Sequence, residues 1–159
     1  MQVPLADVST GRTHDYYHPM ILSHLTLGVN NVADAIAFYD AVLGELGIKR
    51  ERSGVGYAGW GREGDGGFYV TRPFDRTAAS AGNGVSVSFL APSRAAVDRF
   101  WCKAVELGGK DEGEPGLRPH YHASYYAAYV RDLDGNKIAA LCHRAGGPGE
   151  AAPPGAQPR

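Results

Sequence analysis

The stretch Ile21–Val29 has the sequence ILSHLTLGV, and it decides the fold because the chain repeats it. Shifting the sequence by 62 residues places His24–Leu27 on Ser86–Phe89, within Gly84–Ala91 (GVSVSFLA). Both stretches alternate apolar residues with small or polar ones, which is the pattern of a half-buried strand. A strand is therefore predicted at the start of each of two similar halves.

A helix is predicted after each of these strands. Asn31 and Ser93 are placed to cap the two helices, because their side chains can accept hydrogen bonds from the first helical N–H groups. Apolar residues then recur at helical spacing until a glycine ends each run. The same shift lays Phe38-Tyr39 on Phe100-Trp101, so the two helices match as the strands do.

Further short strands are predicted to complete each half, so that each is a strand, a helix and three strands. In the first half they are Ile48–Arg52, Gly56–Trp60 and Gly67–Thr71, separated by glycine-bearing turns. In the second half a loop follows the helix. After that loop come the strands Tyr125–Arg131 and Lys137–Cys142, joined by a turn over Asp132–Asn136.

These elements predict an α+β fold of two βαβββ modules, at about residues 21–72 and 84–143. A module of this size buries too little surface to be stable alone. The two are therefore expected to pair as curved mixed sheets around a central cavity, with the helices outside. Residues 1–20 are predicted to be an irregular lead-in, and residues 144–159, rich in Gly, Pro and Ala, a disordered tail.

Composition excludes several classes of partner. The formal net charge is -1 and no basic run or stripe is present, so nucleic acid is not an expected partner. No apolar stretch approaches the roughly 20 residues that span a bilayer, so no membrane association is expected. The first twenty residues have no signal-peptide pattern, and a cytoplasmic location is expected.

Three parts of the sequence together resemble the vicinal oxygen chelate superfamily. They are the strand around His24, the helix containing Ala37-Phe38-Tyr39, and the segment Arg131–Ile138 (RDLDGNKI). That superfamily includes glyoxalase I, bleomycin-resistance proteins, fosfomycin-modifying enzymes and extradiol dioxygenases. The resemblance covers roughly residues 21–143, and Leu133 stands where the family usually has proline.

The resemblance implies one divalent metal ion between the halves, with ligands from the first and last strand of each half. Carried over to this sequence, those positions are His24, about Val70, Ser86 and Ala139. Valine and alanine have no donor atom and a serine hydroxyl is a weak ligand, whereas a catalytic divalent site needs about three protein ligands. We therefore expect no cofactor at the standard site, where His24 is the only surviving ligand type.

A different ligand set remains an alternative. His120 and His122 would lie on one face of an extended segment, and with His24 they would form a three-histidine site for Zn, Ni, Mn or Fe if their loop folded over the cavity. The sequence favours a non-ligand role for these histidines, because long loops carry His and Tyr as ordinary recognition groups and nothing in the sequence fixes their distance from His24.

The loop before the last two strands holds the densest polar and aromatic cluster of the chain. In it, Arg118 is a candidate for holding a carboxylate or phosphate, and His120 or His122 for general acid–base chemistry, with Tyr126 as a third candidate catalytic residue. The alternative is a lid that only packs on the sheet. The cluster consists of Arg118, His120, Tyr121, His122, Tyr125 and Tyr126.

Aromatic residues also alternate along the strands of the first half, where some must face inward and others pack in the core. The predicted ligand-binding residues are His24, Tyr57, Trp60, Ser86, Arg118, Tyr121 and Tyr125.

Three functions are open at this point. The first is a homodimeric protein that binds a small molecule without a metal ion, as bleomycin-resistance proteins do. The second is a metal-dependent lyase or isomerase of the glyoxalase type, or a dioxygenase, using His24 with His120 or His122. The third is a dimeric interaction module with a filled core.

Overall fold

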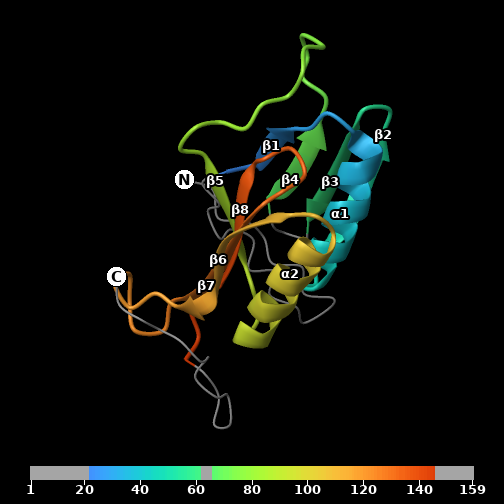
Figure 1. The fold of residues 1–159 in the computed structure, drawn as a ribbon. Helices are drawn as coiled ribbons and strands as arrows, with labels where there is room; N and C mark the ends of the chain where they lie inside the picture. The colour runs from blue at the N-terminus through green and yellow to red at the C-terminus, as the bar shows by residue number, and fades with distance from the viewer. Residues whose placement is uncertain (1–21, 62–65, 146–159) are drawn as a thin grey trace, which may run out of the picture.

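The computed structural model describes residues 22–61 and 66–145, and the structural statements below concern these residues. The predicted lead-in, and the predicted tail from residue 146 on, lie outside them. The helices and strands, in chain order, are β1 (His24–Gly28), α1 (Val32–Gly44), β2 (Lys49–Gly54), β3 (Tyr57–Gly61), β4 (Gly67–Thr71), β5 (Ser86–Leu90), α2 (Arg94–Glu106), β6 (Lys110–Leu117), β7 (Tyr126–Arg131) and β8 (Lys137–Cys142) (Figure 1).

The elements form two sheets, one from each half of the chain. Their strand orders are β1-β4-β3-β2 and β5-β8-β7-β6. In each sheet the first strand pairs in parallel with the last, and the other pairings are antiparallel. The predicted α+β fold of two βαβββ modules is therefore confirmed. The 62-residue repeat also holds, since β1 and β5, like α1 and α2, begin at equivalent positions.

Both predicted helix caps are confirmed. The Asn31 side chain accepts hydrogen bonds from the backbone N–H groups of Ala33 (3.0 Å) and Asp34 (3.3 Å). Ser93 Oγ accepts from the N–H of Ala96 at 3.2 Å. These bonds satisfy donors that the first turn of a helix leaves without partners, and so fix where α1 and α2 begin.

Strand β6 lies where the sequence predicted a loop. Its sequence, KDEGEPGL, contains two glycines and a proline, which normally argue against a strand. Proline has no backbone N–H and cannot donate to a neighbouring strand. The structure tolerates Pro115 because β6 is an edge strand, which has a neighbour on one side only. Its register with β7 also shifts twice, between Asp111 and Gly113 and between Gly113 and Gly116.

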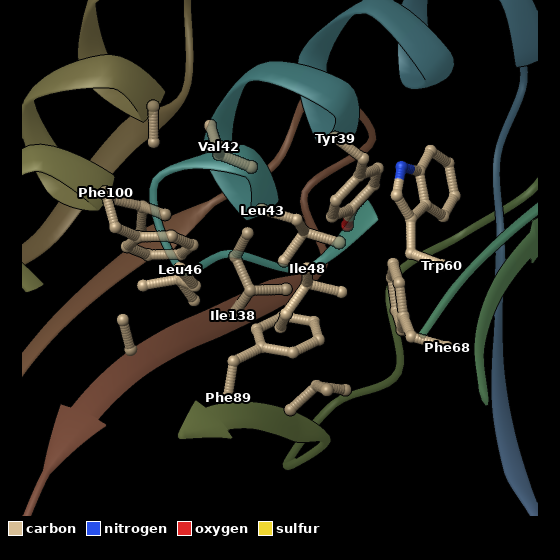
Figure 2. Close-up of a cluster of buried hydrophobic side chains, with 14 of the residues drawn as sticks. Tyr39, Val42, Leu43, Leu46, Ile48, Trp60, Phe68, Phe89, Phe100 and Ile138 are labelled. Atoms are coloured by element: carbon tan, nitrogen blue, oxygen red, sulfur yellow. The ribbon is translucent and has the colours of Figure 1, made fainter. Parts of the chain in front are cut away.

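Each helix covers one face of its own sheet, and the two helices also pack against each other (Figure 1). Leu43 and Leu46, from α1 and the turn after it, lie near Phe100 of α2 and Ile138 of β8 (Figure 2). All four side chains are almost fully buried. One hydrophobic core therefore runs through both halves, and no helix within residues 22–61 and 66–145 covers the opposite face of either sheet.

Polar contacts join the halves at one end of this core. The Tyr39 hydroxyl donates to Asp132 Oδ2 at 2.6 Å, and Asn136 Nδ2 donates to the carbonyl oxygen of Gly28 at 3.2 Å. Asp134 Oδ1 accepts from both the backbone and the side chain of Asn30, at 2.9 and 2.7 Å. The RDLDGNKI segment thus serves as a structural connection between the two modules.

The described part of the chain contains no helix that is long and apolar enough to cross a lipid bilayer.

Candidate functional site

The face of the first sheet that turns away from α1 carries a row of polar and aromatic side chains. In β4, Phe68 and Val70 belong to the core, so Tyr69 and Thr71 point to the opposite face. In β1, Leu27 is buried in the core, and His24 and Thr26 alternate with the apolar positions. We call this surface the open face of the first sheet.

A depression of about 340 Å³ lies on this open face. It is lined by His24, Thr26, Tyr57, Tyr69 and Thr71. The imidazole of His24 meets the Tyr69 ring edge-on, with ring centres 5.8 Å apart. His24 Nδ1 shares a hydrogen bond of 2.8 Å with Ser23 Oγ, which leaves Nε2 as the ring nitrogen available to a ligand.

A second cavity, of about 330 Å³, lies at the junction of the two halves and shares His24 with the depression. Ser86, Ser88 and Phe89 of β5 line it from the second half. Phe68 lines it from the first half and contacts Phe89 edge-on, with centres 5.0 Å apart. A cavity between the halves was predicted, and one is present at this junction.

Trp60, predicted to bind ligand, is mainly a core residue. Its side chain is 1% exposed and its indole N–H donates to Asp40 Oδ1 at 2.9 Å. It packs beside Tyr39 and Phe68 (Figure 2). Trp60 borders the junction cavity but offers it no free polar group.

Tyr126, predicted to be catalytic, also belongs to the core. It is 4% exposed, and its hydroxyl donates to Asp98 Oδ1 of α2 at 2.7 Å. Tyr125, the preceding residue, points to the opposite face of the sheet, because side chains alternate along a strand. The structure therefore separates Tyr126 from the polar cluster in which the sequence placed it.

The remaining cluster residues gather beside the start of β7 and the end of β8. They lie toward the face of the second sheet that turns away from α2, which we call the open face of the second sheet. Tyr121 lies between His120 and Tyr125, with ring centres 4.3 and 4.7 Å away. His143, which the sequence did not single out, joins them through a hydrogen bond of 2.8 Å from His122 Nε2 to its Nδ1.

The direction of the hydrogen bond between His122 and His143 follows from a neighbouring backbone group. His122 Nδ1 accepts a hydrogen bond from the backbone N–H of Ser124 at 3.2 Å, so its ring proton is on Nε2. His122 is then the donor and His143 Nδ1 the acceptor of the hydrogen bond between the two rings.

Arg118 is already engaged by the protein. Its Nη2 donates to the carbonyl oxygen of Glu114 at 2.8 Å, and its Nη1 to that of Leu117 at 3.2 Å. The guanidinium also lies 5.7 Å from the centre of the Tyr129 ring. Burial raises the pKa of Tyr129 to about 12, with Tyr125 and Tyr121 adding to the effect. These bonds leave Arg118 fewer donors for a carboxylate ligand than the sequence suggested.

The predicted site residues thus form separate groups. His24, Tyr57 and Ser86 line the depression or the junction cavity, whereas Arg118, His120, Tyr121, His122 and Tyr125 lie together on the second sheet. Within residues 22–61 and 66–145, no three His, Cys, Asp or Glu side chains are placed to hold one metal ion. One chain therefore does not bring His24 together with His120 and His122.

The residues at the family's metal positions do not fit a divalent ion. Val70 points into the core, and the open-face residues of β4 nearest His24 are Gly67 and Tyr69. Ala139 is fully buried and has no donor atom. His24 would be joined only by neutral hydroxyl groups, which are weak ligands for Zn, Ni, Mn or Fe.

Sequence reasoning missed Tyr69 and His143 as site residues. The signal for Tyr69 was its position between Phe68 and Val70: once these two are assigned to the core, Tyr69 must face the other way. His143 follows β8 in step with Ala139 and Leu141, which the same alternation places on the open face of the second sheet.

Comparisons with known proteins agree with this architecture. The family model described as "Glyoxalase/Bleomycin resistance protein/Dioxygenase superfamily" matches residues 21–140. A crystal structure of a glyoxalase/bleomycin resistance protein from Albidiferax ferrireducens T118 is 36% identical, with a TM-score of 0.73. That alignment covers 77% of this chain and 99% of the other. No curated protein matches the sequence at a significant level.

More distant structures share the fold alone. A glyoxalase/bleomycin resistance protein/dioxygenase family enzyme from Burkholderia phytofirmans PsJN is 18% identical, with a TM-score of 0.61, over 77% of this chain and 98% of the other. A lactoylglutathione lyase from Agrobacterium tumefaciens is 19% identical, with a TM-score of 0.56, over 79% and 96%. On the extent of the family match and the 36% identity, this chain belongs to the glyoxalase/bleomycin resistance protein/dioxygenase superfamily.

Proposed function

We propose that this protein binds a small organic molecule in the depression on the first sheet and the adjoining junction cavity, without a metal ion. The observation that carries the proposal is the chemistry of the lining. Among the described residues that line the depression or the junction cavity, only His24 offers a metal donor stronger than a neutral hydroxyl group. The other lining side chains are apolar, aromatic or hydroxyl-bearing, as in pockets that hold organic ligands.

We further propose that the protein works as a homodimer. Each sheet has one face covered by a helix and one face without such cover, and Leu90 on the uncovered face of the second sheet is 61% exposed. A second copy could cover these faces and enclose the ligand more fully than one chain does. The likeness to a bleomycin resistance protein supports sequestration or sensing of the ligand over its conversion.

Ligand binding is tested by thermal unfolding in the presence of a library of small organic molecules. A ligand that binds only the folded state raises Tm, and the rise grows with the logarithm of the ligand concentration above Kd. Hits should lose their effect in His24→Ala and keep it in His120→Ala, a matched histidine variant outside both spaces. A protein that no library member stabilises would contradict the proposal and favour an interaction module.

Metal independence is tested by elemental analysis of protein purified without chelator. We expect far less than one Zn, Ni, Mn or Fe ion per chain. A near-stoichiometric ion that is lost in His24→Ala and retained in His120→Ala would overturn the metal-free proposal.

The histidine pair on the second sheet favours an enzyme as the second candidate. His122 and His143 share a 2.8 Å hydrogen bond between their rings, and imidazole is the side chain that most often serves in general acid–base chemistry. This candidate is a lyase or isomerase for an α-hydroxycarbonyl compound, or a dioxygenase. Turnover of such compounds, with or without added divalent metal, that falls in both His122→Gln and His143→Gln would favour it.

A further inference from the structure

We infer that Tyr69 is a fixed stacking platform that makes the proposed site selective for a planar, aromatic ligand. This inference rests on the proposed binding function and adds the chemical class of the ligand. Its basis is the way in which two glycines hold the Tyr69 ring on the open face of the first sheet.

The Tyr69 ring lies directly over two stretches of bare backbone. A Cβ atom added to Gly59, its partner on β3, would lie 2.4 Å from Cε1 of the ring. A Cβ added to Gly67, two residues earlier on β4, would lie 2.4 Å from Cε2. Gly59 thus leaves room for one face of the ring above β3, and Gly67 leaves room for the Cε2 edge of the ring.

Backbone conformation does not explain these glycines. Neither Gly59 nor Gly67 is among the glycines with positive φ, so any residue could adopt their extended conformation. Glycine inside a strand is destabilising by roughly 0.5–1 kcal/mol relative to alanine. What glycine provides at both positions is space, because a Cβ atom at either one would collide with the Tyr69 ring.

Tyr69 belongs to the lining of the 340 Å³ depression. The imidazole of His24, another lining residue, stands at 82° to the Tyr69 ring with ring centres 5.8 Å apart. The single hydroxyl proton of Thr71 has two carbonyl acceptors within reach, those of Gly56 and Arg72, both at 3.2 Å. The other polar groups of the lining are His24 Nε2 and the hydroxyls of Thr26, Tyr57 and Tyr69.

An aromatic ring, Tyr69, beside a hydrogen-bonding imidazole at a right angle to it, His24, favours one kind of ligand. A planar ring can stack on Tyr69 while a hydroxyl or carbonyl group at its rim bonds to His24. A saturated ring of the same size carries the same polar group but cannot stack closely. Packing of a tyrosine over glycines also occurs in sheets for purely structural reasons, so the test must compare ligands as well as variants.

The test measures the binding of 2-naphthol and of its saturated analogue, decahydro-2-naphthol, by titration calorimetry or ligand-detected NMR. We expect wild type to prefer 2-naphthol by about fivefold, the size of one aromatic pair interaction. The preference should persist in Tyr69→Phe and disappear in Tyr69→Leu, while the affinity for the saturated alcohol changes little. Gly59→Ala, which displaces the ring, should behave like Tyr69→Leu.

The control is Gly44→Ala, because a Cβ at Gly44 would meet no atom within 4 Å. A readout without ligand is also available, since a ring face over the backbone shifts the Hα resonances of Gly59 upfield, and Tyr69→Leu should remove the shift. The Tyr69 variants keep the test valid if Gly59→Ala does not fold.

Two results would overturn the platform and leave the proposed function intact. One is equal affinity of wild type for both alcohols, and the other is an aromatic preference that survives in Tyr69→Leu. Failure of wild type to bind either alcohol would also overturn the platform. The library experiment above then shows separately whether the binding function fails as well.

Discussion

The carboxylate of Asp132 is almost fully buried and accepts four hydrogen bonds. Its Oδ1 accepts from the backbone N–H groups of Asp134 (3.0 Å) and Asn136 (2.8 Å). Its Oδ2 accepts from the Tyr39 hydroxyl at 2.6 Å and from Asn136 Nδ2 at 3.0 Å. A buried carboxylate with this many donors is fully satisfied, so its place in the molecule is structural.

Replacing Tyr39 with phenylalanine should destabilise the protein through this carboxylate. The variant keeps the ring but removes one donor to a buried charge, a change that costs about 1.5–3 kcal/mol. Urea unfolding followed by circular dichroism measures the loss. The control is Tyr121→Phe, since Tyr121 is 62% exposed and should change stability by less than about 0.5 kcal/mol. Equal stability of both variants would show that the Tyr39 bond contributes nothing.

The same residue predicts how stability depends on alkaline pH. Burial, with the charge of Asp132, raises the pKa of Tyr39 well above its ordinary value of 10.0. The unfolded chain then releases this proton at a pH where the folded chain still holds it. The stabilisation is complete below about pH 10 and decreases as the pH rises further.

Urea midpoints at pH 8, 9, 10 and 11 test this dependence. Wild type should lose stability above pH 10 more steeply than Tyr39→Phe. Tyr129, whose pKa is raised to about 12, acts in the same direction in both proteins, so the difference between them isolates Tyr39. Parallel curves for the two proteins would contradict the prediction.

Part of the candidate site was predictable from the alternation of side chains along strands. Tyr57 and Trp60 are three residues apart on β3, so they cannot share a face, and only Tyr57 lies on the open one. Tyr125 and Tyr126 are adjacent and separate for the same reason. Applying the period to each strand would have placed Trp60 and Tyr126 on the core side and Tyr69 on the open face, whereas no local pattern reveals the contact between His122 and His143.

Among the elements, α1 depends on a single side chain for its first turn. Asn31 accepts two backbone hydrogen bonds there, and its Nδ2 donates to Asp34 Oδ2 at 2.6 Å. Asn31→Ala should lower the free energy of unfolding by about 0.5–2 kcal/mol, because the cap is lost. Asn31→Ser keeps a cap acceptor without placing a second negative charge beside Asp34, and it should lose less in the same urea experiment. An alanine variant as stable as wild type would mean that solvent replaces the cap without cost.

Elements with a periodic pattern or a cap were predicted from sequence, and those defined by their neighbours were not. The amphipathic helices and the strands rich in β-branched or aromatic residues belong to the first kind. Strand β6 belongs to the second, because Pro115 and its glycines oppose a strand and only pairing with β7 produces one. Strand β2 was predicted at Ile48–Arg52 and lies at Lys49–Gly54, although it is exposed along its whole length and is held in place by pairing with β3.

For the molecule as a whole, the uncovered faces of the two sheets predict self-association. Wild type at micromolar concentration should elute and scatter light as a dimer. Leu90→Lys places a charge on the uncovered face of the second sheet and should shift the protein toward monomer. Val55→Lys, at the fully exposed turn between β2 and β3, is the matched control and should remain dimeric. A monomeric wild type would contradict the proposed homodimer.

How the halves join is the part that sequence could least predict. The repeat implied that the two modules pair, since neither has a sufficient core alone. The contacts that join them connect residues far apart in the chain, such as Tyr39 with Asp132 and Asn30 with Asp134. Nothing in either local sequence identifies its distant partner, so these contacts needed the structure.

The connection between the halves, residues 72–85, has a practical consequence. Each sheet draws all its strands from one half, and the loop is held to the body by hydrogen bonds between Asn30 and Ala79 of 2.9 and 3.2 Å. Phe74, within this loop, is fully exposed. Cleavage after Phe74 would therefore sever no strand and expose no core. The protein is suited to fragment complementation, in which two separately expressed pieces find each other and restore one folded unit.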